Sequence, residues 1–525
     1  MKFEKKVEKR VNDHLNQFVK NPYEKRRMTF PLWSKIAIPS AALALTAGII
    51  LGVSFSLPKE TVLPSVQPGV SQPPISTQIP EPISTQIPEP TPDPQPTREL
   101  NALVRPNVEH EVMASEHRVT MSLKSYSSYM AFAAKFVPAM MGENTEGQEI
   151  DMSVSIPDAY LALAITGIIS SPLVMEEVLS YLELDSEEEL KTAAHEVITN
   201  LCVLEKDNYG LVDGGFNTNS IWFDPELVEL VEEKDEQLYQ DLADIFGAAV
   251  FMEPCTTDAA TQYLRECAID NMPIPDIALD DDEKHPATIM SSYTCVSRFD
   301  SYTIEYLKEQ YESGEHKMPY GTGSNRKLVD YIKDRTEGAY IYEGNGFHGA
   351  DMEIGMSCAK FFLPDDVNAT ATSILDDVIR KEYSYVTETN NGKEVLKKYN
   401  LTIMAPYFEI NNSLMLKDGL DEPFHTAHNY GGFASRMVNL INPNPLVVEK
   451  ILQFSKVKFD YNGFFSGSAT FVSGAEGAAP PQERPLYTLS LDHPYVFEYV
   501  DNVIMENGSF VEVPKVIGRI VDPVY

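Results

Sequence analysis

Histidine and acidic residues are the first candidates for metal or acid–base chemistry in this sequence, and none has the spacing that such chemistry needs. His110 and Glu111 are followed by His117, whereas two zinc ligands on one helical face require H-E-x-x-H. His425 and His428 could meet on a helix, but the NYGG that follows them is typical of a loop. The sequence therefore predicts ordinary surface histidines, no metal site and no other cofactor.

Three short motifs resemble catalytic or ligand-binding loops, but each lacks a defining residue. GTGSNRK (residues 321–327) does not end in the G-K-[ST] of a phosphate-binding loop, and residues 463–467 read GFFSG instead of the nucleophile motif G-x-S-x-G. The acidic run DDDE at 280–283 lacks the spacing of a calcium loop. Because no set of acid, base and nucleophile can be assembled, we do not expect an enzyme.

The cysteines do not indicate a disulfide scaffold or a thiolate zinc site. They are odd in number, lie far apart and form no C-x-x-C pair. We expect them to behave as small buried apolar groups. They are Cys202, Cys255, Cys267, Cys295 and Cys358.

Length and charge restrict the class of protein. A chain of 525 residues with 43% hydrophobic content can bury a large core. Its 78 acidic and 42 basic residues give a net charge of −36, which makes nucleic acid a poor partner because phosphates repel an acidic surface. We therefore predict that the chain does not bind nucleic acid.

The charge changes sign near the amino end, where a membrane anchor is predicted. Residues 36–57 carry no charge and are long enough to cross roughly 30 Å of hydrocarbon. Arg26, Arg27 and Lys35 precede this stretch, while Lys59 alone follows it closely. The positive-inside rule then predicts a cytoplasmic basic tail (1–35), a transmembrane helix (36–58) and an extracellular remainder, a single-pass protein of the cell membrane.

Two other interpretations of the apolar stretch remain open. A cleaved signal peptide normally has a shorter apolar region and follows a shorter leader. A buried core helix is less favoured, since the 22 positions show no amphipathic pattern. After the stretch comes a proline-rich segment (59–99), in which PISTQIPE occurs twice, at 74–81 and 82–89. Such a composition favours polyproline II and predicts an extended extracellular linker.

Residues 100–525 have the mixed pattern of a single α+β domain. Ser186 and Glu189 form a capping box in front of an amphipathic stretch. NSIWF (219–223) is typical of a strand, and Asp224 is predicted to cap a helix that runs to residue 246. AAVF (248–251) and the segments 287–299, 360–364 and 401–410 are also predicted strands. Helices dominate early and strands late, which indicates α+β instead of regular βαβ units.

Four collinear motifs in this domain resemble the serpin family. DHPYVFEYVDN (492–502) with VIGRIVDP (516–523) is similar to the family's carboxyl-terminal signature. Segments 327–347 with 361–366, segment 405–420, and the NSIWF strand with the helix expected after it match further stretches of the family. The resemblance implies three β-sheets, about nine helices and an exposed reactive loop that serves as bait for a protease.

The resemblance also implies a mechanism and a partner. Cleavage of the loop would let it insert into the main sheet and carry the acylated protease across the molecule, so the expected partner is a serine or cysteine protease. Strand insertion of this kind releases stored strain. On this basis residues 454–463 lead into the loop and residues 464–485 form it.

The expected hinge of the loop is rich in small residues, which suits a strand that slides between two others. A plain flexible surface loop would have the same composition. Phe464 departs from the family pattern, and we expect its ring to hinder insertion through overpacking, at a cost of about 1–3 kcal/mol. The hinge residues are Gly463, Phe464, Ser466, Gly467, Ser468, Ala469 and Thr470.

The resemblance places the opening of the sheet at five further residues. In these shutter and breach positions Gln453 replaces the usual histidine, Asp158 a serine, Ser291 an asparagine and Phe299 a tryptophan. The fifth residue is Ser155.

Counting along the loop places the scissile bond near Gly477 and Ala478, which favours an elastase-like or subtilisin-like target. Arg484 is a trypsin-like alternative, although Pro485 after it hinders cleavage. Three classes of function follow in order of support. The first is a membrane-tethered extracellular inhibitor, the second a non-inhibitory serpin-like binding module, and the third an enzyme.

Overall fold

The computed structural model describes residues 98–523 apart from internal gaps, and the described residues belong to one compact unit. The expected cytoplasmic tail, the transmembrane helix and the linker up to residue 97 lie outside the described residues. Within the described part, no helix is both long and apolar enough to span a membrane. The gaps are 107–119, 143–148, 203, 207–211, 269–273, 276, 282–283, 300, 314–316, 323–325, 355–356, 391–392, 416–424, 442–445, 449–450 and 467–483.

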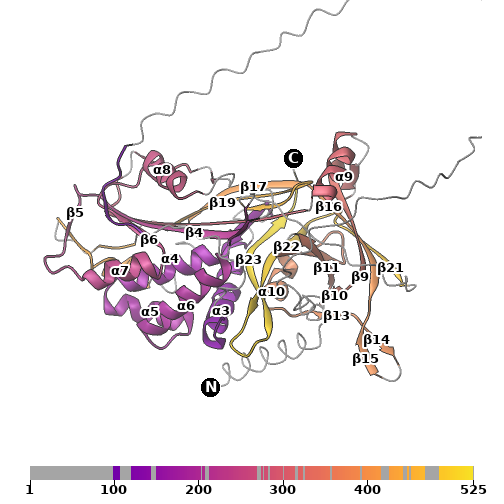
Figure 1. Cartoon of the computed structure of the whole chain (residues 1–525), viewed down its shortest axis with the longest axis horizontal. Coiled ribbons are helices and arrows are strands. Elements are labelled where there is room, and N and C mark those ends of the chain that lie inside the picture. Colours follow the sequence, from indigo (N-terminus) through magenta and orange to yellow (C-terminus); the bar gives the residue numbers. More distant parts are fainter. Residues whose placement is uncertain are drawn as a thin grey trace, which may run out of the picture. The chain divides into compact units, whose positions relative to one another are not determined.

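The largest β-sheet, called here the main sheet, runs through the centre of the domain (Figure 1). Its strands in spatial order are β1 (Ala102–Val104), β6 (Ala248–Phe251), β4 (Val212–Phe223), β7 (Ala287–Arg298), β20 (Gly463–Ser466), β19 (Ile451–Asp460) and β17 (Phe408–Met415), and β3 (Leu204–Lys206) also pairs with β4.

Two further large sheets pack beside the main sheet. The seven-stranded sheet has the order β13 (Ser384–Tyr385), β10 (Ile341–Glu343), β11 (Phe347–Ile354), β12 (Ser357–Pro364), β22 (Tyr495–Ile504), β23 (Phe510–Ile520) and β2 (Met152–Ser155). The four-stranded sheet has the order β21 (Leu486–Ser490), β16 (Tyr399–Pro406), β9 (Lys327–Ala339) and β8 (Lys317–Tyr320). Two-stranded pairs are β14 (Thr387–Asn390) with β15 (Lys393–Leu396) and β18 (Val438–Leu440) with β5 (Val228–Leu230).

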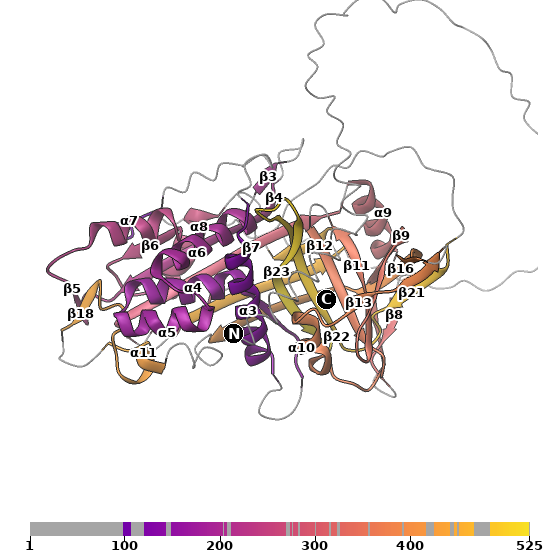
Figure 2. The same cartoon turned by 90° about the horizontal axis from the view of Figure 1, so that it is seen from below.

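The described residues form nine helices, and most of them cover one face of the main sheet (Figures 1 and 2). Every residue of α4 is buried, because this helix is apolar all round and packs between the sheet and other helices. Helix α8 lies on the opposite face of the sheet (Figure 1). The nine are α3 (Leu123–Met140), α4 (Ile156–Ile169), α5 (Pro172–Leu182), α6 (Glu187–Leu201), α7 (Glu236–Asp244), α8 (Thr257–Cys267), α9 (Ser301–Glu312), α10 (Thr372–Ile379) and α11 (His425–Asn429). The α+β class, the three large sheets and the number of helices agree with the sequence-based expectation.

The structure confirms one predicted helix start and corrects another. At α6 the Glu189 amide donates to the Ser186 hydroxyl at 3.2 Å, as a capping box requires. The helix expected directly after Asp224 is wrong. Asp224 accepts from the Glu226 amide at 2.9 Å in a turn, β5 follows, and α7 begins only after its cap, Asp235. Pairing of β5 with β18 decides this segment, and a contact so distant in sequence leaves no local signal.

The predicted strand at 401–410 is in fact parts of two strands in two sheets. β16 ends at Pro406 and β17 begins at Phe408, so the chain passes from the four-stranded sheet into the main sheet at Tyr407. All five cysteines are free; Cys267 and Cys295 are buried as expected, whereas the other three are partly exposed.

Residues of the carboxyl-terminal signature have identifiable structural roles. A Cβ on Gly518 would lie 2.4 Å from the Phe497 ring, so only glycine fits there. Arg519 is buried and donates to the Ile150 carbonyl at 2.9 Å and to the Thr372 hydroxyl at 2.6 Å. The imidazole of His493 bonds the Pro364 carbonyl at 2.9 Å. The signature therefore closes β22 and β23 onto the rest of the domain.

A fully buried ion cluster crosses the seven-stranded sheet. The Lys360 ammonium lies 3.0 Å from carboxylate oxygens of both Asp351 and Glu512, and it also bonds the Tyr342 hydroxyl. Removing one partner of a buried pair leaves an uncompensated charge. We expect Lys360→Met to lower the free energy of unfolding by about 3–5 kcal/mol in urea denaturation.

The matched control for that substitution is an ion pair at the surface. Lys317 and Asp330 lie 2.8 Å apart, and 42% of the Lys317 side chain is exposed. Exposed pairs contribute little, so Lys317→Met should change the unfolding free energy by less than about 1 kcal/mol. Equal effects of the two substitutions would contradict the cost assigned to the buried cluster.

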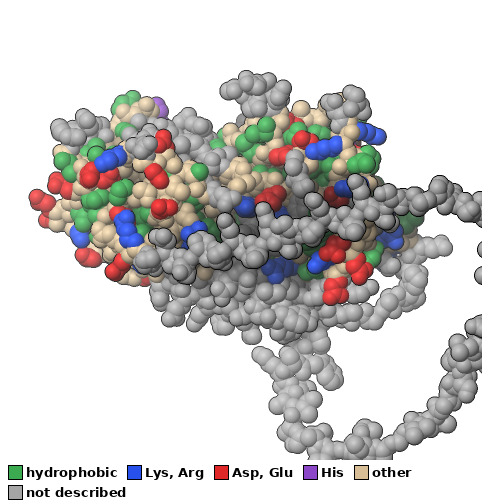
Figure 3. Space-filling view, turned by 90° about the horizontal axis from the view of Figure 1, so that it is seen from above, with side chains coloured by type: hydrophobic (Ala, Val, Ile, Leu, Met, Phe, Trp, Pro, Cys, Tyr) green, Lys and Arg blue, Asp and Glu red, His purple; other side chains and the backbone are tan. Residues whose placement is uncertain are grey.

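Charged side chains at the surface are mixed in sign. On the face drawn in Figure 3, the described Lys and Arg side chains are interspersed with Asp and Glu. A nucleic-acid surface would instead gather cations along one groove. That this chain does not bind nucleic acid stays a prediction.

Candidate functional site

The main sheet is only partly closed between its two central strands, and we call this boundary between β7 and β19 the seam. The two strands pair directly at one end, where Ile289–Ser291 of β7 face Ile451–Gln453 of β19 in parallel. At the other end β20 lies between them and pairs with both. Between these stretches, residues 292–294 pair with β4 and residues 454–457 pair with β17, on the edges away from the seam. The seam is therefore closed at one end and filled by an added strand at the other.

The added strand corrects the expected beginning of the loop. Residues 463–466, called here the hinge, were expected to be the exposed start of the reactive loop, but they form β20 inside the main sheet. β20 is antiparallel to both neighbours, with Phe464 opposite Phe459 of β19 and Ser297 of β7. The chain reaches this position through a tight turn, in which Asp460 accepts from the Asn462 amide at 2.7 Å.

Gly463 is required at the start of β20. Its φ is +138°, and a Cβ there would lie 2.3 Å from the Ser297 carbonyl oxygen and 2.8 Å from the Arg298 Cα. Both neighbours are backbone atoms, so no side-chain movement could make room. Beside it, the Phe299 amide donates to the Asn462 carbonyl at 3.1 Å. The breach residue Phe299 thus lies at the hinge.

The expected overpacking by Phe464 is wrong for the position that the ring occupies. Its side chain is completely buried and stacks on Tyr499 of β22, with ring centroids 4.3 Å apart and an interplanar angle of 12°. The Phe497 ring meets it at 61°. On Tyr499, the Lys515 ammonium lies 4.4 Å from the ring centroid, a cation–π distance. The aromatic side chains of β22 therefore provide the room that sequence reasoning could not foresee.

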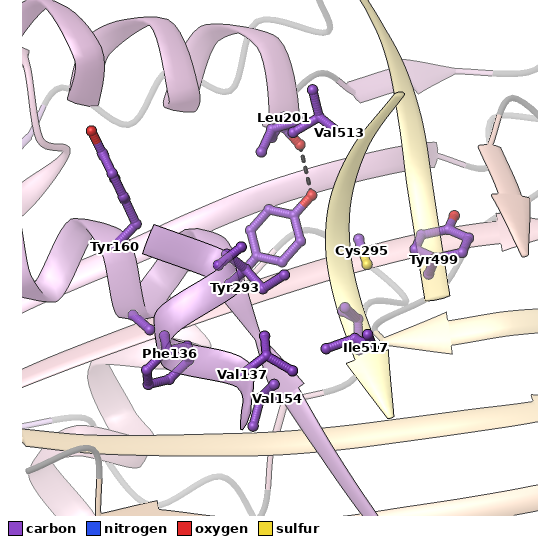
Figure 4. Close-up of a cluster of buried hydrophobic side chains, with 14 of the residues drawn as sticks. Phe136, Val137, Val154, Tyr160, Leu201, Tyr293, Cys295, Tyr499, Val513 and Ile517 are labelled. Atoms are coloured by element: carbon purple, nitrogen blue, oxygen red, sulfur yellow. Dashed lines mark hydrogen bonds between the residues drawn. The ribbon is translucent and has the colours of Figure 1, made fainter. Parts of the chain in front are cut away.

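Tyr499 also binds the strand next to the hinge. Its hydroxyl donates to the hydroxyl of Ser297, the residue of β7 that faces Phe464. Figure 4 shows Tyr499 close to Cys295 of β7, and Tyr293 of the same strand donating to the Leu201 carbonyl. Tyr499 and Phe497 are functional candidates that sequence reasoning missed. Both belong to the signature YVFEY, so their place in that motif was the available signal.

At the closed end of the seam, Gln453 binds the start of α4. Its Nε2 donates to the Ser155 carbonyl at 2.7 Å, and its Oε1 accepts from the Ser155 amide at 3.2 Å. Both residues are buried. An amide that satisfies a buried N–H and C=O together is costly to remove, since each would lose its partner. Gln453 therefore locks β19 to β2 and α4 where the sheet would have to open.

Asp158 lies in the first turn of α4 near this lock and has no hydrogen-bond partner. It is 1% exposed, and neither carboxyl oxygen meets a donor in bonding geometry; the Ser155 hydroxyl is also unpaired. Burial raises the pKa of Asp158 to about 7, although the electrostatic effect of Ser155, Gln453 and the first amides of α4 opposes the rise. The carboxyl is therefore half protonated near neutral pH.

Ser291 faces Gln453 directly across the seam. Its hydroxyl donates to the Asn219 side-chain oxygen at 2.6 Å, and the Asn219 amide group donates to the Phe246 carbonyl at 2.7 Å. Asn219 of β4 was not singled out from the sequence. The structure thus brings Ser155, Asp158, Ser291 and Gln453 to one end of the seam, and it places Phe299 at the other.

The far end of the loop is anchored on the four-stranded sheet. A Cβ on Gly338 would come within 2.8 Å of the Arg484 guanidinium, so Arg484 packs on this glycine. The Pro485 carbonyl then accepts from the Asn400 amide at 2.9 Å, and β21 begins at Leu486. This packing disfavours Arg484 as the cleavage site. The other loop residues predicted above, Gly467, Ser468, Ala469, Thr470, Gly477 and Ala478, lie outside the described residues.

The residues that meet at the seam are suited to opening and closing a sheet. Among the described residues, no cluster of three or more His, Cys, Asp or Glu side chains could hold a metal ion. The seam combines a glycine-led added strand, a polar lock and a gap in strand pairing between them. Such an arrangement can accept further residues of the same chain as a strand.

Comparison with known proteins shows the fold. No family model and no curated protein matches the sequence. Among solved structures, Serpin48 of the insect Tenebrio molitor is 15% identical, with 76% of this chain and 98% of that chain covered and a TM-score of 0.52. Tengpin, a thermophilic serpin in the native state, is 14% identical over 81% of this chain and 100% of its own, with a TM-score of 0.55. Thyroxine-binding globulin in complex with thyroxine is 13% identical over 75% and 99%, with a TM-score of 0.52. The chain has the serpin fold.

Proposed function

We propose that the chain is a membrane-tethered extracellular inhibitor of a serine or cysteine protease, and that it acts by insertion of its reactive loop into the main sheet. The observation that carries this proposal is the half-filled seam, in which β20 already lies between β7 and β19 while the strands beyond it remain unpaired with each other. Residues that follow Ser466 have an open continuation of the same strand position.

The register of β20 defines where inserted residues would lie. Phe464 faces Ser297 and Phe459; continuing the same antiparallel register by six residues brings Thr470 opposite Ser291 and Gln453. Side chains two residues apart share a face, so Thr470 would point to the same side as Phe464. Full insertion would then break the direct contact between Ser291 and Gln453 and open the lock.

The covalent step follows from loop cleavage by the target. The protease serine or cysteine attacks the Gly477 carbonyl, an ester or thioester forms, and the amino group of Ala478 leaves. Insertion before hydrolysis of this acyl link would trap the enzyme. The small residues around the bond favour a protease of the elastase or subtilisin type.

The tether is part of the same proposal and is supported by the sequence alone. The uncharged stretch at 36–57, the cations before it and the proline-rich segment after it favour a single-pass anchor with the serpin domain outside the cell membrane. Protease treatment of intact cells should remove the domain and leave the amino-terminal tail protected. Protection of the domain with loss of the tail would reverse the proposed orientation.

A second function is favoured by the lock and by the buried hinge. Gln453 holds both backbone groups of Ser155, and Phe464 fills its aromatic site, so a sheet that stays shut would make the chain a non-inhibitory binding module. Thyroxine-binding globulin, one of the similar structures, is a serpin-fold protein in complex with thyroxine. This candidate predicts loop cleavage without insertion.

One incubation separates the two functions. The full chain in detergent is mixed with elastase-, subtilisin-, trypsin- and papain-type proteases, and the products are analysed by denaturing electrophoresis and mass spectrometry. The inhibitor should give a covalent complex that resists denaturant, with the acyl bond near Gly477. Free protease and clipped chain across the whole panel would contradict inhibition and support the binding module.

A further inference from the structure

The buried carboxyl of Asp158 has no role in the fold that its contacts explain. An ionised carboxylate without donors in a buried site is strongly disfavoured, yet both oxygens of Asp158 lack partners, and its side chain is 1% exposed. The adjacent hydroxyl of Ser155 is unpaired as well. Two unsatisfied polar groups side by side indicate that this site is tuned for something other than maximal stability.

The position of the carboxyl relates it to the lock of the seam. Asp158 lies three residues after Ser155, whose backbone N–H and C=O are both held by Gln453 of β19. Gln453 in turn faces Ser291 in the stretch where β7 and β19 pair directly. Any separation of the two strands at this point disturbs the groups nearest to Asp158.

Other titratable and charged groups around the site do not neutralise it. Tyr129 of α3 and Cys202 at the end of α6 feel the charge of Asp158, which raises their pKa values further beyond the effect of burial. Lys515 of β23, whose charge reaches Cys202, is paired with Asp501 at 3.0 Å. From β7, Ser291 and Tyr293 are neutral and already donate to Asn219 and Leu201. The remaining neighbours are the neutral side chains of Ser155 and Gln453.

We propose that Asp158 is a proton-controlled lock: its protonated form keeps the seam closed, and its ionisation favours opening between Ser291 and Gln453. This proposal deepens the proposed function, because it assigns a regulator to the same seam. Opening admits water and frees the Gln453 amide as a donor, so the carboxylate gains partners that the closed seam denies it. The protonated acid needs only one acceptor, and the Ser155 hydroxyl is available beside it.

The direction of the pH effect follows from linkage. The carboxyl of Asp158 ionises with a pKa of about 7 in the closed sheet and near its ordinary value of 3.8 when solvated. Below 3.8 both states are protonated, so the closed state has its full advantage there, and it loses that advantage as pH rises toward 7. Each pH unit in this window should raise the opening equilibrium by up to about tenfold, and the effect should level off above 7.

Hydrogen exchange of the uncleaved full chain in detergent tests the proposal without any protease. After correction for intrinsic exchange, peptides covering 287–294 and 451–457 should open up to about 100-fold more often at pH 7 than at pH 5. Asp158→Asn removes the titration and should make the opening independent of pH. Asp158→Ser serves the same purpose if the asparagine variant does not fold. A wild-type profile that is flat from pH 5 to 8 would overturn the proposal whatever the variants do.

A second buried acid provides the matched control. Burial also raises the pKa of Asp334, but this residue lies on β9 in the four-stranded sheet. Asp334→Asn should leave the pH profile of the seam peptides as in the wild type; loss of the profile in this variant would assign it to a general effect and overturn the proposal. The protease incubation remains a separate test. A pH-dependent seam without covalent complexes would remove the inhibitor function and leave the lock intact.

Discussion

Replacing Phe464 with alanine is expected to free the hinge from the main sheet. The ring is fully buried, stacked on Tyr499 and contacted by Phe497, and truncation of a buried phenylalanine typically costs about 3–5 kcal/mol. An exposed loop residue would cost almost nothing. The free energy of unfolding should therefore fall, up to the free energy that holds the hinge in place, and amides of residues 463–466 should lose protection from hydrogen exchange.

Two variants make the Phe464 result interpretable. Phe464→Leu keeps most of the buried volume and should cost well under half as much as alanine. Tyr499→Phe keeps the stacked ring but removes the hydroxyl that binds Ser297, so it should weaken β7 more than the hinge. An alanine variant with wild-type stability and wild-type protection at 463–466 would show that the hinge does not occupy the seam in solution.

Gly463→Ala is expected to have the second large effect, because it makes the β20 position unattainable. The added Cβ would lie 2.3 Å from the Ser297 carbonyl, and the φ of +138° is one that L-residues rarely adopt. Strain of this kind costs about 1–3 kcal/mol before the clash is counted, which shifts the hinge out of the sheet by at least about fivefold to 150-fold. The loop should then be cleaved faster by a non-target protease, and cleavage should no longer lead to insertion.

Gly508→Ala separates strain from steric clash. Gly508 also has a positive φ, +79°, but no atom lies within 4 Å of the Cβ position, in the turn between β22 and β23. This variant should lose some stability while its loop is cleaved at the wild-type rate. If both alanine variants behave alike in the cleavage assay, the close approach of Gly463 to β7 is not what positions the hinge.

Much of the fold could be predicted because its signals are local or carried by contiguous motifs. The capping box at Ser186 depends on residues three apart, and the strands at 219–223 and 248–251 depend on short runs of suitable residues. The helix expected after Asp224 failed for the opposite reason. Pairing of Val228–Leu230 with Val438–Leu440 overrides the local pattern, and nothing near Asp224 in the sequence reports it.

The site was predicted in position but not in physics. The alignment of family motifs identified Gln453, Ser155 and Asp158, yet the pairing of the Gln453 amide with both backbone groups of Ser155 joins residues 298 positions apart. The expected penalty for Phe464 assumed a filled core. The ring of Tyr499, placed by a strand at the other end of the domain, offers it a stacking partner instead. Packing partners of this kind are set by tertiary structure and leave no trace in local spacing.

Thermal unfolding before and after cleavage of the loop tests the central claim most directly. The full chain is clipped between residues 467 and 483 by a protease that is then removed, and the two forms are compared by calorimetry with hydrogen exchange at residues 292–294 and 454–457. Insertion predicts a large rise in the melting temperature of the cleaved form and new protection at both segments, since a strand would fill the seam. An unchanged melting temperature with unchanged exchange at the seam would contradict the account.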